Sequence, residues 1–568
     1  MNPAGIGRDA MMRHVRYLTE QCALRFSGTA PQKKAAQYIF DQLNASGIDV
    51  RMEEFFGYGS VPVSGTLEIL FPQKRQVDCE VVCYSRDLAD AEYPLEDLGA
   101  GTQENFRHAD LRGKVALVNA YEGPGTPEKA RMAQSRGAAG MILITWPAPV
   151  KNVATYRAFK GIWGNPDRTD KEDIPSLCAV SVGHQDGLRL RKECRDGSVT
   201  VRLHGQCATG WVRLYEPVAV IRAPEPTEEF LLVTGHVDAW ARGASDNATG
   251  VALMIELARY FHEAPGQLKR NVVFVFYDGH EVLEATGSSC IAERFWDKLR
   301  DHGVMEMNID SPGLVGASSY RTFANFELMD DLKRIHEEIG LGEKTQMLPI
   351  TRDSDRSYLA LGLPGFLTVE DGESEGPGIP FSWWCHTSED TLDKLDGEML
   401  ERTAAVFVRY ILEFAGSNRI PFSIARPMQA LSRAAEDCVT ACGERLSCVD
   451  FSSVIAGMRE LCALYGELDR RRGRDSTRLM PLYRRVLQRM APVLYTASGR
   501  YRQDHYGDIR CEKTAPLLEP LRAMAETEPG SEKFFLLYTE CLRVRNILSD
   551  FVKISKEEVG AWTAGENS

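Results

Sequence analysis

Three short apolar runs alternate with polar segments in the middle of the chain. Residues 230–235, 271–277 and 305–309 are rich in β-branched and other apolar side chains, and their length is typical of buried strands. Between the first two runs, residues 250–261 carry apolar side chains at three- and four-residue spacing, which predicts a helix. The strand, helix, strand order predicts an open α/β fold, in which ligands bind at the carboxyl ends of the strands.

Nitrogen and carboxylate side chains follow these strands and recur in the loops nearby. In chain order they are His236, Asp238, Asp246, Glu281, Asp310 and His386. Zinc binds imidazole nitrogen and carboxylate oxygen at about 2.0 to 2.2 Å. Two such ions in a hydrolase lie about 3.5 to 4 Å apart and need a bridging carboxylate, for which Asp246 is the candidate. We therefore predict a two-zinc hydrolytic site, with His236 and Asp310 on one ion and Glu281 and His386 on the other. Another divalent metal is possible with the same ligands.

The motifs around these residues resemble a known family. His236-Val237-Asp238, residues 244–250, residues 308–311 and residues 385–391 are similar, in the same order, to motifs of the co-catalytic zinc aminopeptidase and glutamate carboxypeptidase family. The resemblance spans about residues 230 to 396. It implies a mixed-sheet, phosphorylase/hydrolase-like zinc exopeptidase fold of the α/β class. It also implies that Asp238 is a carboxylate behind the metal, holding His236 in its ligating tautomer.

One position departs from the family pattern. Family members carry two adjacent glutamates after the strand, the first as general base and the second as ligand, whereas this chain has His280-Glu281. Counting forward from Arg270 puts His280 at the base position and Glu281 at the ligand position. Counting backward from Gly287 would instead make Val282 the ligand, and valine cannot bind zinc, so we favour the first register.

An imidazole can replace the glutamate as a base, because its unperturbed pKa of about 6.5 lies near neutrality. The family mechanism would then have a metal-bridging water attack the scissile carbonyl of a short peptide or amide while His280 moves the proton. Other roles for His280 are an extra metal ligand or a silent position, and Glu284 is a second candidate acid–base group. The alternatives for the whole chain are a catalytically silent, receptor-like binding protein and an amidohydrolase of a non-peptide metabolite.

The rest of the chain predicts further domains, because single cores rarely exceed about 250 to 300 residues. We assign residues 1–58 to the start of the catalytic domain, 59–215 to a β-rich protease-associated (PA) insertion, 216–418 to the catalytic domain and 419–568 to a helical domain. Within the insertion, residues 114–118 and 140–145 predict strands and residues 130–137 a helix. Residues 174–177 predict a closing strand and residues 180–188 a closing helix. By analogy with the family, the insertion would roof the site and favour short peptides.

Helical periodicity also marks both ends of the chain. Residues 11–22 and 31–46 near the start, and 454–471, 480–495 and 532–551 near the end, carry apolar residues at helical spacing. Relatives with a PA insertion often end in a helical domain that forms a homodimer. A monomeric helical cap has the same sequence signature.

Composition narrows the choice of partners and compartment. The net charge of −13 argues against a nucleic-acid partner, and no run of about 18 apolar residues predicts a membrane span. The first residues lack an apolar core of signal-peptide length, so we expect a cytoplasmic protein. The 14 cysteines lack CxxC spacing, and reduced thiols are the expectation. Cys385, beside His386, is expected to be a buried or pocket-lining thiol rather than a nucleophile.

Two segments are candidates for substrate contact. Residues 372–380, rich in Gly, Pro and Glu, precede Trp383 and Trp384, which would either wall a specificity pocket or pack in the interior. Arg356, after Ser354-Asp355, would either receive a substrate carboxylate or form a surface ion pair.

Overall fold

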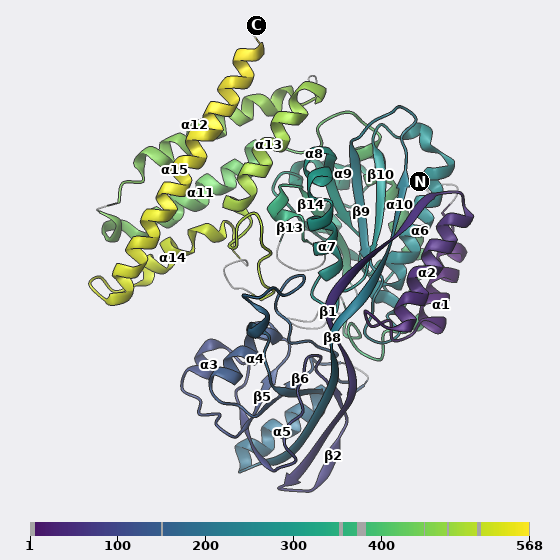
Figure 1. The fold of residues 1–568 in the computed structure, drawn as a ribbon, viewed down its shortest axis with the longest axis vertical. Helices are drawn as coiled ribbons and strands as arrows, with labels where there is room; N and C mark the ends of the chain where they lie inside the picture. Colours follow the sequence, from purple (N-terminus) through teal and green to yellow (C-terminus); the bar gives the residue numbers. More distant parts are fainter. Residues whose placement is uncertain are drawn as a thin grey trace.

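A mixed sheet occupies the centre of the catalytic part of the chain (Figure 1). The computed structural model describes residues 6–148, 151–350, 356–371, 382–447, 449–473, 476–507 and 513–566. Four strands of the sheet run parallel, in the order β14 (Gly365–Asp371), β11 (Gly303–Asn308), β9 (Phe230–His236) and β10 (Asn271–Tyr277). Beyond β14 lie β12 (Ser319–Ala324), antiparallel to it, and β13 (Thr345–Pro349). The three predicted strands and the α/β mixed-sheet class are confirmed.

Helices cover both faces of this sheet, which explains why its central strands read as continuous apolar runs. Alternate residues of β9 point to opposite faces: Leu231 and Val233 belong to one apolar core and Leu232 to another. The first core is closed by α1 (Arg8–Gln21), α2 (Ala30–Ala45), α6 (Thr249–Glu263), α9 (Met329–Glu338) and α10 (Gly397–Ala415). The second is closed by α7 (Thr286–Arg294) and α8 (Trp296–His302).

Two very long strands join the central sheet to the inserted domain. β1 (Asp49–Phe71) and β8 (Thr200–Ile221) pair from Asp49 opposite Val220 to Phe71 opposite Thr200. β8 also pairs with β10 at one end and with β4 (Tyr93–Asp97) at the other, so this ribbon runs from one domain into the next (Figure 1). The proposed boundaries at residues 59 and 215 fall inside these two strands.

The sheet continues through β4 into the inserted domain. Strands β4, β5 (Val115–Asn119), β6 (Gly140–Ile144) and β7 (Cys178–Val182) are parallel, and β3 (Cys79–Val81) pairs antiparallel with β7. β2 (Arg75–Val77) pairs with β1, and α3 (Gln103–Arg107), α4 (Thr126–Ser135) and α5 (His184–Asp196) complete the domain. The closing strand starts at Cys178 rather than at residue 174, because Pro175 has no N–H for a central sheet position.

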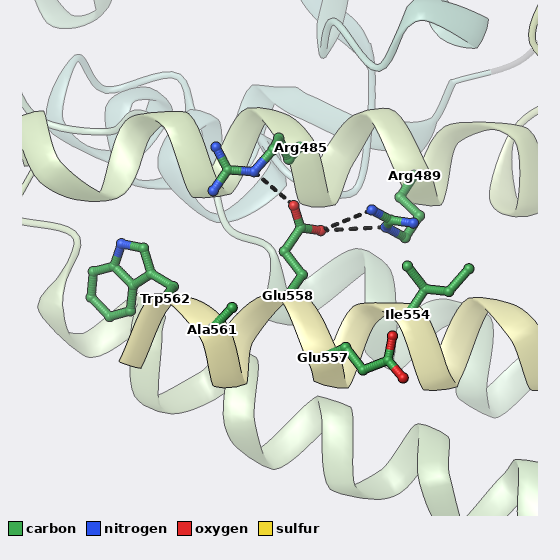
Figure 2. Close-up of a pocket in the computed structure, with 7 residues that line it drawn as sticks. All are labelled: Arg485, Arg489, Ile554, Glu557, Glu558, Ala561 and Trp562. Atoms are coloured by element: carbon green, nitrogen blue, oxygen red, sulfur yellow. Dashed lines mark hydrogen bonds and ion pairs between the residues drawn. The ribbon is translucent and has the colours of Figure 1, made fainter. Parts of the chain in front are cut away.

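The chain ends in the predicted helical region. Its helices are α11 (Ala425–Cys442), α12 (Ser452–Arg471), α13 (Ser476–Leu494), α14 (Glu519–Glu526) and α15 (Glu532–Glu566). Figure 2 shows how α15 is tied to α13: Glu558 accepts hydrogen bonds from Arg485 Nε at 2.7 Å and Arg489 Nε at 3.3 Å. These ion-paired residues line an open groove between the two helices, together with Trp562. Among the described helices, none is long and apolar enough to cross a membrane.

Candidate metal centre

The Asp246 carboxylate lies between two imidazoles. Its Oδ1 is 3.1 Å from His236 Nε2 and its Oδ2 is 3.2 Å from His386 Nε2. Each imidazole faces a second acid: Asp310 Oδ1 lies 3.6 Å from His236 Nε2, and Glu281 Oε2 lies 3.2 Å from His386 Nε2. The structure thus brings together all five predicted ligands, in the pairing expected for two ions that share Asp246.

The strand ends account for this convergence. His236 is the last residue of β9, while Glu281 and Asp310 follow β10 and β11 on the same edge of the sheet. Asp246 belongs to the irregular turn Ala244–Ala248 that leads into α6. His386 comes from the loop before α10 and has a left-handed backbone, with φ of 56°.

Asp390 fixes the main chain of the turn that carries Asp246. Its Oδ1 accepts hydrogen bonds from Ser245 N at 2.8 Å and Ser245 Oγ at 2.7 Å, and its Oδ2 accepts one from Asp246 N at 3.0 Å. Burial raises the pKa of Asp390 to about 6 in spite of these donors. The sequence placed Asp390 inside a family motif but gave no sign of this supporting role.

The Asp238 carboxylate binds the main chain of the loop that follows β10. Its carboxylate accepts hydrogen bonds from His280 N at 3.1 Å, Glu281 N at 3.0 Å and Ser27 Oγ at 3.1 Å. The carboxylate Oδ1 lies 3.6 Å from His236 Nδ1, whereas the Asp238 main-chain oxygen lies closer, at 3.0 Å. The main-chain carbonyl is therefore the nearer partner that fixes the His236 tautomer, and the carboxylate chiefly orients His280 and Glu281.

His280 and Glu281 follow the first of the two sequence registers. The His280 ring stacks on the His236 ring, with centroids 4.2 Å apart, and each of His280, His236 and Asp310 offers a ligand atom within 4.8 Å of the others. Glu281 faces His386, whereas Val282 is a buried core residue. His280 thus lies where either a base or an extra ligand would be.

The second acid–base candidate, Glu284, is half-buried in the same loop. Burial raises the pKa of its carboxyl to about 8, although Lys160 and His280 act in the opposite direction. Its backbone is left-handed, with φ of 46°. The side chain is therefore set in a constrained turn close to the cluster.

The donor set fits zinc. Burial opposes charge on His236, yet Asp238, Asp246 and Asp310 together raise its pKa well above the ordinary value. Burial raises the pKa of Glu281, and its Oε1 is buried without a hydrogen-bond partner among the described residues. A divalent cation would neutralise the negative charge of these clustered acids and bind the oxygen that lacks a partner. Imidazole nitrogen and carboxylate oxygen are ligands that zinc accepts.

A segment of the inserted domain touches the centre, which the sequence did not reveal. Tyr156 N donates to the His386 main-chain oxygen at 2.8 Å, and Arg157 Nη1 lies 3.4 Å from His386 Nδ1. The Tyr156 ring stacks on Trp240, whose indole N–H donates to Glu281 Oε2 at 2.7 Å. The segment has no regular periodicity, so only its tertiary contacts identify it.

The residues predicted to contact the substrate are buried where the structure describes them. Trp383 and Trp384 are buried and pack with Trp146 and Leu314, which favours interior packing over a pocket wall. Arg356 is buried and lies 5.5 Å from the Phe323 ring, so the surface ion-pair interpretation is wrong. Residues 354–355 and 372–380 lie outside the described residues.

Cys385 is a buried neighbour of the metal ligands. Its Sγ lies 3.6 Å from Asp246 Oδ2, and burial raises the pKa of the thiol to about 12. A protonated thiol is a poor nucleophile. The expectation of a pocket-lining thiol is consistent with this position.

Comparison with known proteins places these features in a family. Residues 218–411 match the model of peptidase family M28, and residues 80–190 match the PA domain. Aminopeptidase YwaD of Bacillus subtilis is 23% identical over 433 residues, which cover 73% of this chain and 87% of that protein. A glutamate carboxypeptidase 2 homolog of Caenorhabditis briggsae is 28% identical over 284 residues, but the match covers only 38% of this chain and 36% of that protein.

Solved structures share the fold. An aminopeptidase from Aneurinibacillus sp. strain AM-1 has a TM-score of 0.56 at 23% identity and covers 73% of this chain and 95% of its own. A peptidase M28 precursor from Shewanella amazonensis SB2B has a TM-score of 0.60 at 20% identity and covers 72% and 93%. Together with the motifs, the family-model matches confirm the predicted resemblance: the catalytic region, residues 218–411, is similar to peptidase family M28, and residues 80–190 to a PA domain.

Proposed function

We propose that this protein is a zinc-dependent exopeptidase that holds two ions. The observation that carries the proposal is the Asp246 carboxylate, with one oxygen facing His236 and the other facing His386. His236, Asp246 and Asp310 would hold one ion, and Asp246, Glu281 and His386 the other. When bound, zinc would polarise the scissile carbonyl and lower the pKa of water.

The protein's own groups would manage the proton. The half-exposed His280 ring, stacked 4.2 Å from His236, is the proposed base, because a neutral imidazole accepts a proton near neutrality. Asp238 supports this role by holding His280 N and Glu281 N at 3.1 and 3.0 Å.

The role of Asp238 predicts the behaviour of Asp238→Asn. Both carboxylate oxygens of Asp238 accept hydrogen bonds from main-chain N–H groups. In the asparagine variant one of these oxygens is replaced by an NH2 group, which cannot accept a hydrogen bond from His280 N or Glu281 N. We expect zinc affinity to fall about 10- to 100-fold, as for other groups that orient metal ligands. Competition with a chelator measures this, with Asp110→Asn, which alters an exposed carboxylate of the inserted domain, as the control. Equal affinity in both variants would contradict the role.

Turnover of a peptide and amide library by the zinc-loaded protein tests the function. Exopeptidase activity predicts release of a terminal residue from unblocked dipeptides and tripeptides. Protein that binds fewer than about two zinc ions and turns over nothing would favour the receptor-like alternative. Turnover of non-peptide amides alone would favour an amidohydrolase.

Arg157 bears on the direction of cleavage. The half-buried guanidinium lies 3.4 Å from His386 Nδ1 and 4.8 Å from the Trp146 ring, so a cation borders the metal ligands. Arginine pairs strongly with carboxylates. We therefore expect substrates with a free C-terminal carboxylate to be preferred, and Arg157→Ala to lose about tenfold or more on them while C-terminally amidated analogues are unaffected. Equal losses on both substrate types would remove Arg157 from recognition.

The homodimer is proposed through the C-terminal helices. Phe535, Leu536 and Ile547 of α15 are 60%, 61% and 44% exposed, which supports a partner surface on this helix. Light scattering of the 63.4 kDa chain should give twice that mass at micromolar concentration. A monomer would contradict the proposal. The cytoplasmic location and the absence of a nucleic-acid partner stay predictions.

A further inference from the structure

The segment of the inserted domain that borders the metal centre also enters the catalytic domain. Lys160, with no exposed surface, donates from Nζ to the Leu283 main-chain oxygen at 2.5 Å and to Thr286 Oγ1 at 3.0 Å. A few residues further along, Gly164 N donates to the Glu284 main-chain oxygen at 2.8 Å. The inserted domain therefore supplies hydrogen-bond donors to Leu283 and Glu284 of one catalytic loop and to Thr286, the first residue of α7.

That loop, residues 279–286, carries His280 and Glu281. Glu284 and Ala285 both have left-handed backbones, with φ of 46° and 53°, a conformation that L-residues adopt only when their surroundings impose it. Inside the loop, Ala285 N donates to His280 O at 3.1 Å and Thr286 N donates to Gly279 O at 2.9 Å. The turn is thus internally closed, and its outward carbonyls are satisfied from another domain.

The other side of the loop is packed by β1. A Cβ atom added to Gly57 would lie 2.5 Å from Leu283 Cδ2, so the strand backbone and the Leu283 side chain are in close contact. Leu283 is consequently held by β1 on its side chain and by Lys160 on its carbonyl. A shift of Lys160 would act directly on the turn that follows Glu281.

Packing alone does not explain a lysine at this place. Burying an ammonium group is costly, and methionine would fill a similar volume without that cost. Burial lowers the pKa of Lys160 to about 7, while Glu284, Cys290 and Asp170 act in the opposite direction. The hydrogen bonds from Nζ to Leu283 O and Thr286 Oγ1 help to offset this cost.

We infer that Lys160 is a positioning residue of the catalytic centre. By binding Leu283 O and Thr286 Oγ1 it fixes the turn that aims His280 and Glu281, so the inserted domain completes the centre as well as covering it. The inference rests on the proposed function for its kinetic consequence, but the positioning of the loop does not depend on it.

The test compares Lys160→Met and Lys160→Arg with Lys171→Met, which alters an exposed lysine of the same domain. Hydrogen exchange across residues 279–290 of the full chain is expected to be at least several-fold faster in Lys160→Met and unchanged in Lys171→Met. Because a displacement of about 1 Å can cost about 100-fold, kcat should fall about 10- to 100-fold with KM within about twofold. Zinc content and the unfolding midpoint should stay close to those of the unaltered protein, and Lys160→Arg should recover part of kcat.

The loss should be equal on the smallest dipeptide and on longer peptides, since a positioning defect does not depend on substrate size. Unchanged exchange and kcat in Lys160→Met would overturn the inference. So would faster exchange throughout the chain with a lowered unfolding midpoint, which marks a purely structural lysine. Should Lys160→Met be insoluble, Thr286→Val, which removes one of the two acceptors, carries the same test. If the unaltered protein turns over no substrate while exchange still changes locally, the proposed function fails and the positioning stands.

Discussion

Replacement of Asp246 by asparagine is expected to abolish the binding of both ions and to lower turnover by at least about 1000-fold. The carboxylate oxygens lie 3.1 Å from His236 Nε2 and 3.2 Å from His386 Nε2, so a single side chain serves both halves of the centre. An amide keeps the shape but presents one oxygen and one N–H, and the N–H cannot bind a cation. A 1000-fold loss corresponds to about 4 kcal/mol of transition-state stabilisation.

Metal analysis and kinetics of the same preparation check this expectation. Asp246→Asn should hold almost no zinc, whereas Asp110→Asn should hold as much as the unaltered protein. Full zinc content together with activity within tenfold of the unaltered protein would show that Asp246 does not bridge the ions.

Replacement of His280 by alanine should lower kcat about 100- to 10,000-fold and leave the zinc content unchanged, because the loss of a general base has this size. A base must be neutral to accept a proton, so activity of the unaltered protein should fall as the pH drops below about 6 to 7. The variant His280→Glu restores the residue that the family carries, so it should be far more active than His280→Ala. The fall in its activity at acidic pH should occur at a lower pH than in the unaltered protein, since a carboxyl ordinarily titrates near 4 to 5.

Glu284→Gln is the matched control for His280. Burial raises the pKa of Glu284 to about 8. If the activity of the unaltered protein changes near that pH and this change is missing in Glu284→Gln, then Glu284 rather than His280 transfers the proton. Zinc lost together with activity in His280→Ala would identify His280 as a ligand, as its approach to His236 and Asp310 allows. If neither variant changes the activity, the proton-transfer assignment is wrong.

The inserted domain contacts the loop that carries His386. The ribbon of β1 and β8 joins the inserted domain to the catalytic part (Figure 1). Thr155 of the inserted domain forms an antiparallel bridge with Thr387, beside His386. The main-chain contact of Tyr156 with His386 O, at 2.8 Å, couples the position of that ligand to the inserted domain. Changes in the insertion should therefore affect chemistry as well as substrate size.

The sequence by itself determined the elements whose signals are local. Strand periodicity located β9, β10 and β11. Zinc chemistry and the resemblance to the family motifs together proposed His236, Asp246, Glu281, Asp310 and His386 as ligands. Helical spacing located the C-terminal helices, although α15 runs to Glu566 rather than to residue 551. The strand and helix predictions succeed because each depends on residues within one or two turns or strands.

Only the tertiary structure decided how separate segments complete the centre. Three contacts at the centre join residues more than 100 positions apart: Asp390 with Asp246, Arg157 with His386, and Lys160 with Leu283. It also decided between packing and pocket for Trp383 and Trp384, which burial assigns to the interior. Such contacts leave no periodic trace, because they are made by irregular segments whose partners are chosen by the fold rather than by neighbours in the chain.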